Sequence, residues 1–238
     1  MMDAAGHWVS RACECQESER ELRRLAAAGI PRKYLNCTLD TFAIDFNGAS
    51  PLLGKALQYA RKFVEAYPVD TGGKGLLIVG PNGVGKTHLA IGVLQRLIRE
   101  RGVKGLFCDY RELLKKIQHS WNPQVQATEL DLLTPMATVE VLVIDDLGTQ
   151  KPSDWAWDTV AYILNARYNG GLSTIITTHF PDLPAGSGEL KDAERAARHQ
   201  TLGDRIGDSM LSRLAEMCIK IEMAGGDLRQ TVKRAAFG

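Results

Sequence analysis

The chain has 238 residues, of which 45% are apolar and 24% are charged, so it can bury the core of one large domain. Its 29 Lys and Arg against 28 Asp and Glu leave a net charge of +1, which argues against a protein that attracts nucleic acid or membranes by overall charge. No apolar run reaches the roughly eighteen residues of a membrane-spanning helix. The start of the chain lacks a basic stretch followed by an apolar one, and five Cys do not suggest a disulfide framework. We therefore expect a reduced, cytoplasmic protein with no membrane partner.

Three regions differ in composition. Residues 1–40 are rich in charge, and 17–24 suggest a short helix whose charges form i,i+4 pairs on a solvated face. Residues 41–230 alternate apolar strand-like runs with amphipathic stretches of helix length, which predicts a parallel sheet covered by helices. Residues 231–238 form a short basic tail. We expect an N-terminal helical segment, one α/β domain and this tail.

The elements predicted within the α/β domain alternate between strands and helices. The strands are short apolar runs, and we place them at 76–79, 106–108, 141–144, 173–178 and 218–222. The helices carry their apolar residues on one face, and we place them at 52–67, 86–101, 110–119, 155–168 and before Met217.

A glycine-rich loop follows the first predicted strand. Residues 80–87 match G-x-x-x-x-G-K-[ST], and the required strand and helix flank them, which argues against a chance glycine-rich turn. Glycines let successive N–H groups point inward, the helix N-terminus adds positive potential, and the lysine reaches the outer phosphates of a nucleotide. We assign nucleotide binding to Gly80, Pro81, Asn82, Gly83, Val84, Gly85, Lys86, Thr87 and His88.

Polar residues end two further predicted strands. Asp145 and Asp146 directly follow the run 141–144; beside the phosphate loop they could hold Mg²⁺ and polarise an attacking water, although two acids at a strand end could also form a turn. His179 follows 173–178 at the same edge, where ligands of open α/β sheets bind. It could hold the attacking water or be an ordinary surface histidine.

Several ordered runs resemble one known family. They are AGIPRKYL (28–35), TLDTF (38–42), GPNGVGKTHLA (80–90), LVIDDLG (142–148), STIITTHF (173–180), SRLAEM (212–217) and GDLR (226–229). Together they resemble the DnaC/DnaI-type helicase loaders and the IstB-type transposition ATPases, a branch of the AAA+ superfamily. The resemblance extends from about residue 28 to 230.

The resemblance implies a three-layer P-loop NTPase fold, with a parallel sheet of order 5-1-4-3-2 and without a full helical lid domain. It implies binding of ATP and Mg²⁺, slow hydrolysis, and self-association into a ring or filament. In the loaders of this family an N-terminal domain grips the helicase. Residues 1–40 leave room for a helix or two and show no obvious docking domain, so we treat them as a short candidate partner-contact segment.

The resemblance also implies roles for individual residues. Thr87 and Asp145 match the Mg²⁺ site, and Asp146 matches the water-activating acid. His179 matches the first sensor. Arg213 matches the arginine finger that one subunit inserts into its neighbour's site, with Arg205 as the rival, and Arg229 matches a late arginine near the phosphates.

Three departures from the family pattern bear on these roles. Asp146 stands where AAA+ proteins usually carry Glu, so we expect slow hydrolysis, and His179 stands where Asn is common. Cys13 and Cys15 form only a pair, and neither His7 nor Cys37 completes a recognisable four-ligand spacing, so we do not expect zinc.

Two functions fit these features, and a third fits less well. The first is an ATPase that assembles on single-stranded DNA and loads or remodels a replicative helicase; the alternative is an IstB-like ATPase that directs a transposase. A small-molecule P-loop kinase is disfavoured by the paired acids and the Ser-Arg-Leu run. The helix after the second strand is the candidate DNA contact, or else an amphipathic helix with a solvated basic face, through Tyr110, Arg111, Lys115 and Lys116.

Overall fold

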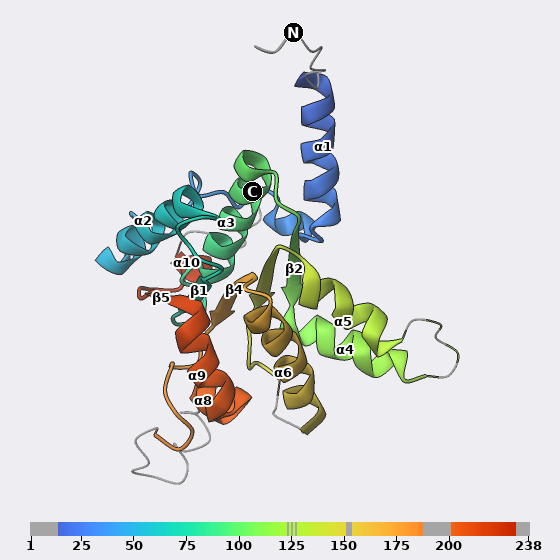
Figure 1. The fold of residues 1–238 in the computed structure, drawn as a ribbon. Coiled ribbons are helices and arrows are strands. Elements are labelled where there is room, and N and C mark those ends of the chain that lie inside the picture. Colours follow the sequence, from blue (N-terminus) through green and yellow to red (C-terminus); the bar gives the residue numbers. More distant parts are fainter. Residues whose placement is uncertain are drawn as a thin grey trace, which may run out of the picture.

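The computed structural model describes residues 14–122, 124, 126, 128–150, 154–187 and 201–231. Its centre is one parallel sheet of five strands in the order β2-β3-β4-β1-β5 (Figure 1). Counted from the other edge this is 5-1-4-3-2, so the expected order is confirmed. The strands are β1 (Gly75–Val79), β2 (Gly105–Asp109), β3 (Val141–Asp145), β4 (Ser173–Thr178) and β5 (Cys218–Glu222).

The inner strands are apolar because both faces of the sheet are covered. Every residue of β3 and of β4 is buried, as expected for strands between two helical layers. The register pairs Val79 with Thr178 and Ile144 with Ile176. The carboxyl ends of β1, β3 and β4 therefore meet at one edge, where the phosphate loop, the paired acids and His179 begin.

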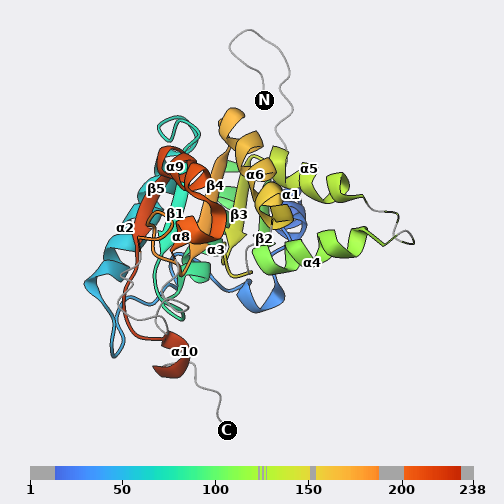
Figure 2. The same cartoon turned by 90° about the horizontal axis from the view of Figure 1, so that it is seen from below.

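Two layers of helices cover the sheet. One layer contains α1 (Glu14–Ala27), α2 (Pro51–Ala66) and α3 (Lys86–Arg101), and α1 stands beside β2 (Figure 1). The other layer, seen from below in Figure 2, contains α4 (Tyr110–Ser120), α5 (Glu129–Thr138), α6 (Asp154–Asn169), α8 (Leu202–Ile206) and α9 (Asp208–Met217). After β5 the described chain adds only α10 (Leu228–Thr231). No helix of the described ranges has the length and apolar character needed to cross a membrane.

The strand positions predicted from the sequence are confirmed to within one residue at each end, but the sequence did not predict helices α5, α8 and α10. Helix α5 carries Pro135 inside it, which obscures its helical pattern, and a capping box of Thr128 and Asp131 opens it. Helix α8 is a five-residue element opened by a second capping box, from Thr201.

One buried cation joins β4 to α5 and to the link before β3, at the edge of the sheet opposite the phosphate loop. Arg167 of α6 is 0% exposed, and burial lowers the pKa of its guanidinium to about 10. It faces backbone carbonyls and one hydroxyl instead of a carboxylate. The guanidinium donates to Ser173 O (2.6 Å), Val139 O (2.7 Å), Thr174 Oγ1 (2.8 Å), Met136 O (2.9 Å) and Glu140 O (3.4 Å).

Candidate nucleotide-binding site

The phosphate loop lies between β1 and α3 and has the backbone that its glycines permit. Gly83 and Gly85 have φ values of 79° and 100°, in the left-handed region that favours glycine. Lys86 is 6% exposed, and its Nζ donates to Pro81 O at 2.9 Å across the loop. Burial lowers the pKa of this amine. The loop thus holds a desolvated cation at the N-terminus of α3, which suits the anionic phosphates of a nucleotide.

Asp145 is buried among hydroxyl donors. Thr87 Oγ1 donates to its two carboxyl oxygens at 2.9 and 3.0 Å, and Thr177 Oγ1 donates to Oδ1 at 2.6 Å. Burial raises the pKa of Asp145 to about 6, although both hydroxyls oppose the rise. A hydroxyl and a carboxylate in contact are oxygen ligands of the kind Mg²⁺ prefers, so the donor set fits that ion.

Thr177 is a site residue that the sequence prediction did not assign. Besides its bond to Asp145, its hydroxyl accepts the backbone N–H of Asp146 at 2.9 Å. This one side chain of β4 therefore positions both acids at the end of β3. Only the Thr-rich end of the strand pointed to it.

Asp146 and His179 lie close together at the edge of the sheet. Asp146 has a φ of 57°, in the left-handed region, and its side chain lines the cavity described below. His179 Nδ1 lies 3.9 Å from Asp146 Oδ1. The imidazole of His179, followed by the ammonium of Lys86, holds the pKa of Asp146 below its usual value against the effect of burial. The carboxylate is thus kept ionised, as a group that polarises water must be.

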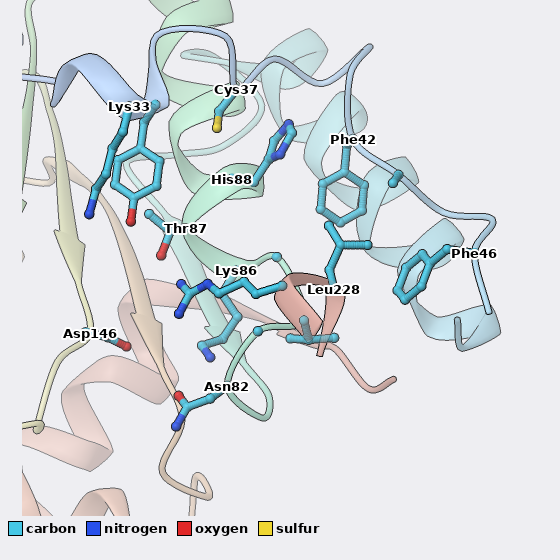
Figure 3. Close-up of a pocket in the computed structure, with 16 residues that line it drawn as sticks. Lys33, Cys37, Phe42, Phe46, Asn82, Lys86, Thr87, His88, Asp146 and Leu228 are labelled. Carbon is cyan, nitrogen blue, oxygen red and sulfur yellow. The ribbon is translucent and has the colours of Figure 1, made fainter. Parts of the chain in front are cut away.

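A cavity of about 360 Å³ opens beside the loop, within the size range of small-ligand sites (Figure 3). Residues 82–88 form one wall. The opposite wall comes from the chain before α2, and the sequence prediction assigned no site role to it: Lys33, Tyr34, Cys37, Phe42, Ala43 and Phe46. The resemblance of the runs 28–35 and 38–42 to family motifs was the one sequence signal that could have pointed to this wall.

The chain after β5 closes the third side of the cavity. Leu228 N donates to Gly83 O at 3.1 Å, and Leu228 and Arg229 both line the cavity. The charge of Arg229 acts on Lys86, contributing to the lowered pKa of that amine. Arg229 therefore lies near the predicted phosphate site.

The two candidate arginine fingers lie outside the lining of this cavity. On α9, Arg213 Nη1 donates to Asn165 Oδ1 of α6. On α8, Arg205 lies 4.5 Å from the Phe180 ring centre, and its Nη1 donates to Gln150 O at 3.3 Å. Which of them acts in a neighbouring subunit stays a prediction.

The DNA candidates on α4 divide into two groups. Arg111, Lys115 and Lys116 are exposed. Tyr110 is 2% exposed and packs in the core cluster beneath α4, and burial raises its pKa to about 12. The expectation that its ring stacks on a base is therefore wrong, because the first residue of the helix points toward the sheet. The side chains of His7, Cys13 and Cys15, and residues 232–238 of the tail, lie outside the described residues.

Comparison with known proteins places this fold and site in one family. The model of the IstB-like ATP binding proteins matches residues 17–236. An uncharacterized protein of Bacillus subtilis, YqaM, is 27% identical over 176 residues, which cover 70% of this chain and 54% of YqaM. The replicative helicase loader DnaC of Buchnera aphidicola subsp. Acyrthosiphon pisum is 26% identical over 188 residues, covering 79% of this chain and 68% of that protein.

The chain thus spans about half the length of YqaM and about two thirds of that DnaC. Among solved structures, a crystal structure of the DnaC helicase loader superposes with a TM-score of 0.65 at 31% identity, covering 81% of this chain and 99% of the other. Together, the match of nearly the whole chain, the sheet order and the phosphate loop show that the protein belongs to the IstB-like ATP binding proteins, a family of the AAA+ type related to the DnaC and DnaI helicase loaders.

Proposed function

We propose that this protein is an ATPase that assembles on single-stranded DNA and loads or remodels a replicative helicase. The observation that supports hydrolysis is the pair Asp146 and His179, 3.9 Å apart at the edge of the sheet that carries the phosphate loop. Support for a role in helicase loading comes from relatives that match most of this chain and are named helicase loaders.

Each site residue has a role in the proposed reaction. Lys86 binds the outer phosphates of ATP, and Thr87 with Asp145 holds Mg²⁺, which neutralises charge on the phosphate oxygens. Asp146 orients the attacking water and accepts its proton, and His179, 3.9 Å away, helps to keep this carboxylate ionised. Arg229 adds positive charge beside Lys86. Because an Asp reaches one methylene less far than a Glu, turnover is slow.

Replacement of Asp146 by Asn is expected to abolish hydrolysis and preserve nucleotide binding. An amide keeps the size of the side chain but cannot accept the proton, so kcat should fall by about 100-fold or more while the Kd for ATP stays within about threefold. Phosphate release and calorimetric titration measure the two quantities. Asp158→Asn, on the exposed face of α6, is the matched control. Equal losses of binding and turnover would instead assign Asp146 a structural or metal-holding role.

Arg213 is expected to act on the ATP of a neighbouring subunit. Its guanidinium is held by Asn165 and lies outside its own cavity, as a group supplied in trans would. The ATPase rate per subunit should therefore rise with protein concentration. Mixing Arg213→Ala with Lys86→Ala subunits should restore activity, because one subunit offers an intact site and the other an intact finger.

The rival residue provides the comparison for this experiment. If Arg205 is the finger, Arg205→Ala abolishes activity and complements Lys86→Ala, whereas Arg213→Ala stays active alone. A rate that does not depend on concentration, with no complementation by either variant, would exclude an assembly that shares its sites.

Single-stranded DNA is expected to bind along α4 through Arg111, Lys115 and Lys116. The charge of Arg111 also helps to lower the pKa of Asp146, so the first turn of α4 lies within electrostatic reach of the nucleotide site. A non-hydrolysable ATP analogue should strengthen binding by promoting assembly, and Lys115→Ala/Lys116→Ala should weaken it and lower the salt slope by about one unit per lysine.

Fluorescence anisotropy with a labelled oligonucleotide measures this binding. Lys55→Ala/Lys62→Ala, which removes two exposed lysines from α2, is the matched control. Affinity that responds neither to the nucleotide nor to the α4 substitutions would remove this helix from the DNA path.

The alternative function, direction of a transposase to DNA, is favoured by the family model that matches residues 17–236. Both functions use the same ATP site, so the partner distinguishes them. Co-sedimentation is carried out with a purified replicative helicase ring and, separately, with a purified transposase, each with and without ATP. A complex with the helicase supports the loader, and a complex with the transposase alone supports the transposase ATPase.

A further inference from the structure

The wall of the cavity that faces the phosphate loop has little secondary structure of its own. Residues 33–46 contribute no strand to the sheet and only the end of a three-residue 3-10 helix, η1 (Arg32–Tyr34). Tyr34 and Phe42 of this segment nevertheless line the cavity, and Figure 3 shows Phe42 in its wall. The position of this wall must therefore come from contacts with other elements, and α3 supplies several of them.

Gln95 of α3 holds the wall through its backbone. The side chain is 2% exposed although it is polar. Its amide nitrogen donates to Cys37 O at 3.0 Å and Leu35 O at 3.1 Å, and approaches Tyr34 O at 3.4 Å. A buried amide without partners is costly, and these carbonyls supply the acceptors for its N–H groups. One side chain thus ties three backbone carbonyls of the wall to the helix that follows the phosphate loop.

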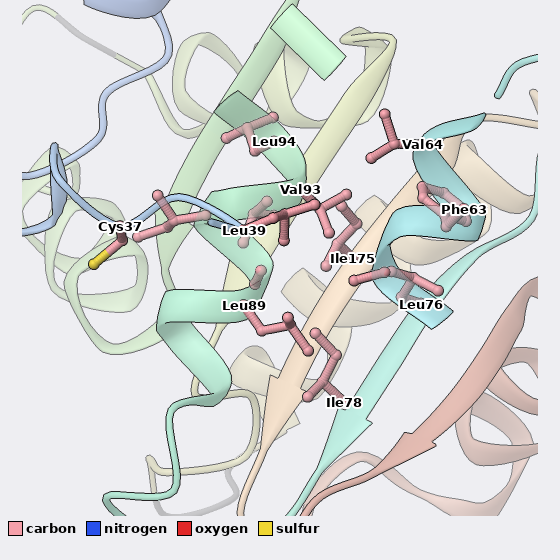
Figure 4. Packing of buried hydrophobic residues seen from close by; sticks show 14 of the residues in the cluster. Cys37, Leu39, Phe63, Val64, Leu76, Ile78, Leu89, Val93, Leu94 and Ile175 are labelled. Carbon is pink, nitrogen blue, oxygen red and sulfur yellow. The ribbon is translucent and has the colours of Figure 1, made fainter. Parts of the chain in front are cut away.

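Gly92 allows the wall to approach α3 closely. A Cβ at this position would lie 3.0 Å from the backbone nitrogen of Leu39 and 3.1 Å from the carbonyl carbon of Thr38. Figure 4 shows Leu39 lying against α3 beside Val93. Glycine weakens a helix interior, so its place here is explained by the backbone that packs on it.

His88 holds the end of the wall nearest to the phosphate loop. Its Nε2 lies 2.9 Å from Thr38 O, and because a carbonyl oxygen only accepts, Nε2 carries the hydrogen in this bond. The ring also packs edge-on against Phe42, with 5.4 Å between the ring centres. His88, Gly92 and Gln95 are spaced i, i+4 and i+7, so they share one face of α3.

We infer that Gln95 is a positioning residue of the nucleotide site, which, with Gly92 and His88, fixes the 33–46 wall against the base and sugar side of ATP. The inference rests on the assignment of the cavity to ATP. The phosphates contact the loop at the N-terminus of α3, whereas the base side depends on the wall. Loosening the wall should therefore weaken binding of the whole nucleotide and leave binding of a bare triphosphate unchanged.

Calorimetric titration of the full chain with ATP and with inorganic tripolyphosphate, both with Mg²⁺, tests this inference. Gln95→Leu keeps the size of the side chain and removes the donors. Its ATP affinity should fall by roughly tenfold or more, while its tripolyphosphate affinity stays within about twofold of the wild type. Gln118→Leu, at an exposed position of α4, is the control and should change neither. Equal losses for both ligands, or no loss for either, would overturn the inference.

Gly92→Ala provides a test that removes no hydrogen bond, for the case in which Gln95→Leu does not fold. The added methyl should push the wall away and reproduce the selective loss of ATP affinity. Gly54→Ala in α2, where a Cβ meets nothing within 4 Å, is the matched control. If Gly92→Ala binds ATP as the wild type does, the inference fails. A wild-type protein that binds neither ligand would refute the nucleotide site itself, which is a different outcome.

Discussion

Replacement of Lys86 by Ala is expected to lower the affinity for ATP by about 100-fold. The side chain is the buried cation of the phosphate loop, and each hydrogen bond from a charged group to a phosphate oxygen contributes about 1.5–3 kcal/mol. Alanine leaves the backbone of the loop intact but removes the charge that neutralises the outer phosphates. Calorimetric titration with ATP and Mg²⁺ measures the change.

The same variant should fold as well as the wild type. Burial lowers the pKa of the Lys86 amine, because keeping this charge out of water is unfavourable in the nucleotide-free fold. Removing the charge should therefore cost little stability. Thermal unfolding without nucleotide checks this point. Lys62→Ala, on the exposed face of α2, is the control for loss of a lysine. Wild-type affinity in Lys86→Ala would show that ATP binds elsewhere.

Replacement of Arg167 by Leu is expected to lower the free energy of unfolding by about 3–5 kcal/mol, the largest stability effect that the fold predicts. The guanidinium is fully buried and donates to four backbone carbonyls and the Thr174 hydroxyl. Leucine fills part of the space but leaves these acceptors without donors. Urea unfolding should show a lower midpoint with an unchanged slope.

Two further variants separate geometry from charge. Arg167→Lys keeps a cation, but one ammonium cannot reach acceptors on three segments, so most of the loss should remain. Arg23→Leu removes an exposed arginine whose side chain is 76% accessible and should change stability by no more than about 0.5 kcal/mol. A stable Arg167→Leu protein would mean that the carbonyls find other donors.

The sheet and the phosphate site could be predicted from the sequence because local patterns determine them. The continuous apolar run 141–144 indicates a strand covered on both faces, and the loop spacing around Lys86 is specific to phosphate binding. Once parallel pairing is assumed, the acids at the end of β3 must lie at the same edge of the sheet as the loop after β1. The register confirms this placement of Asp145.

Other features depend on contacts distant in the sequence. Gln95 is a polar residue on an amphipathic helix, which usually indicates a solvated face; it is buried because a segment about 60 residues earlier covers it. Arg167 is buried for a similar reason, since its acceptors come from α5, from the link between α5 and β3, and from β4. Tyr110 begins a basic helix and suggested a DNA contact, but only the packing beneath α4 reveals that it faces the core.

The left-handed backbone at Asp146 limits which acid the protein can use there. At a φ of 57°, Asp is tolerated far better than most residues with a Cβ, because its short side chain can interact with its own backbone. A glutamate would reach further toward a substrate but would adopt this conformation at a greater cost. At position 146, the backbone conformation therefore favours the shorter Asp, whereas reach toward the substrate favours the longer Glu. A faster enzyme would need a different bend at the end of β3, and exchanging the acid alone should not be enough.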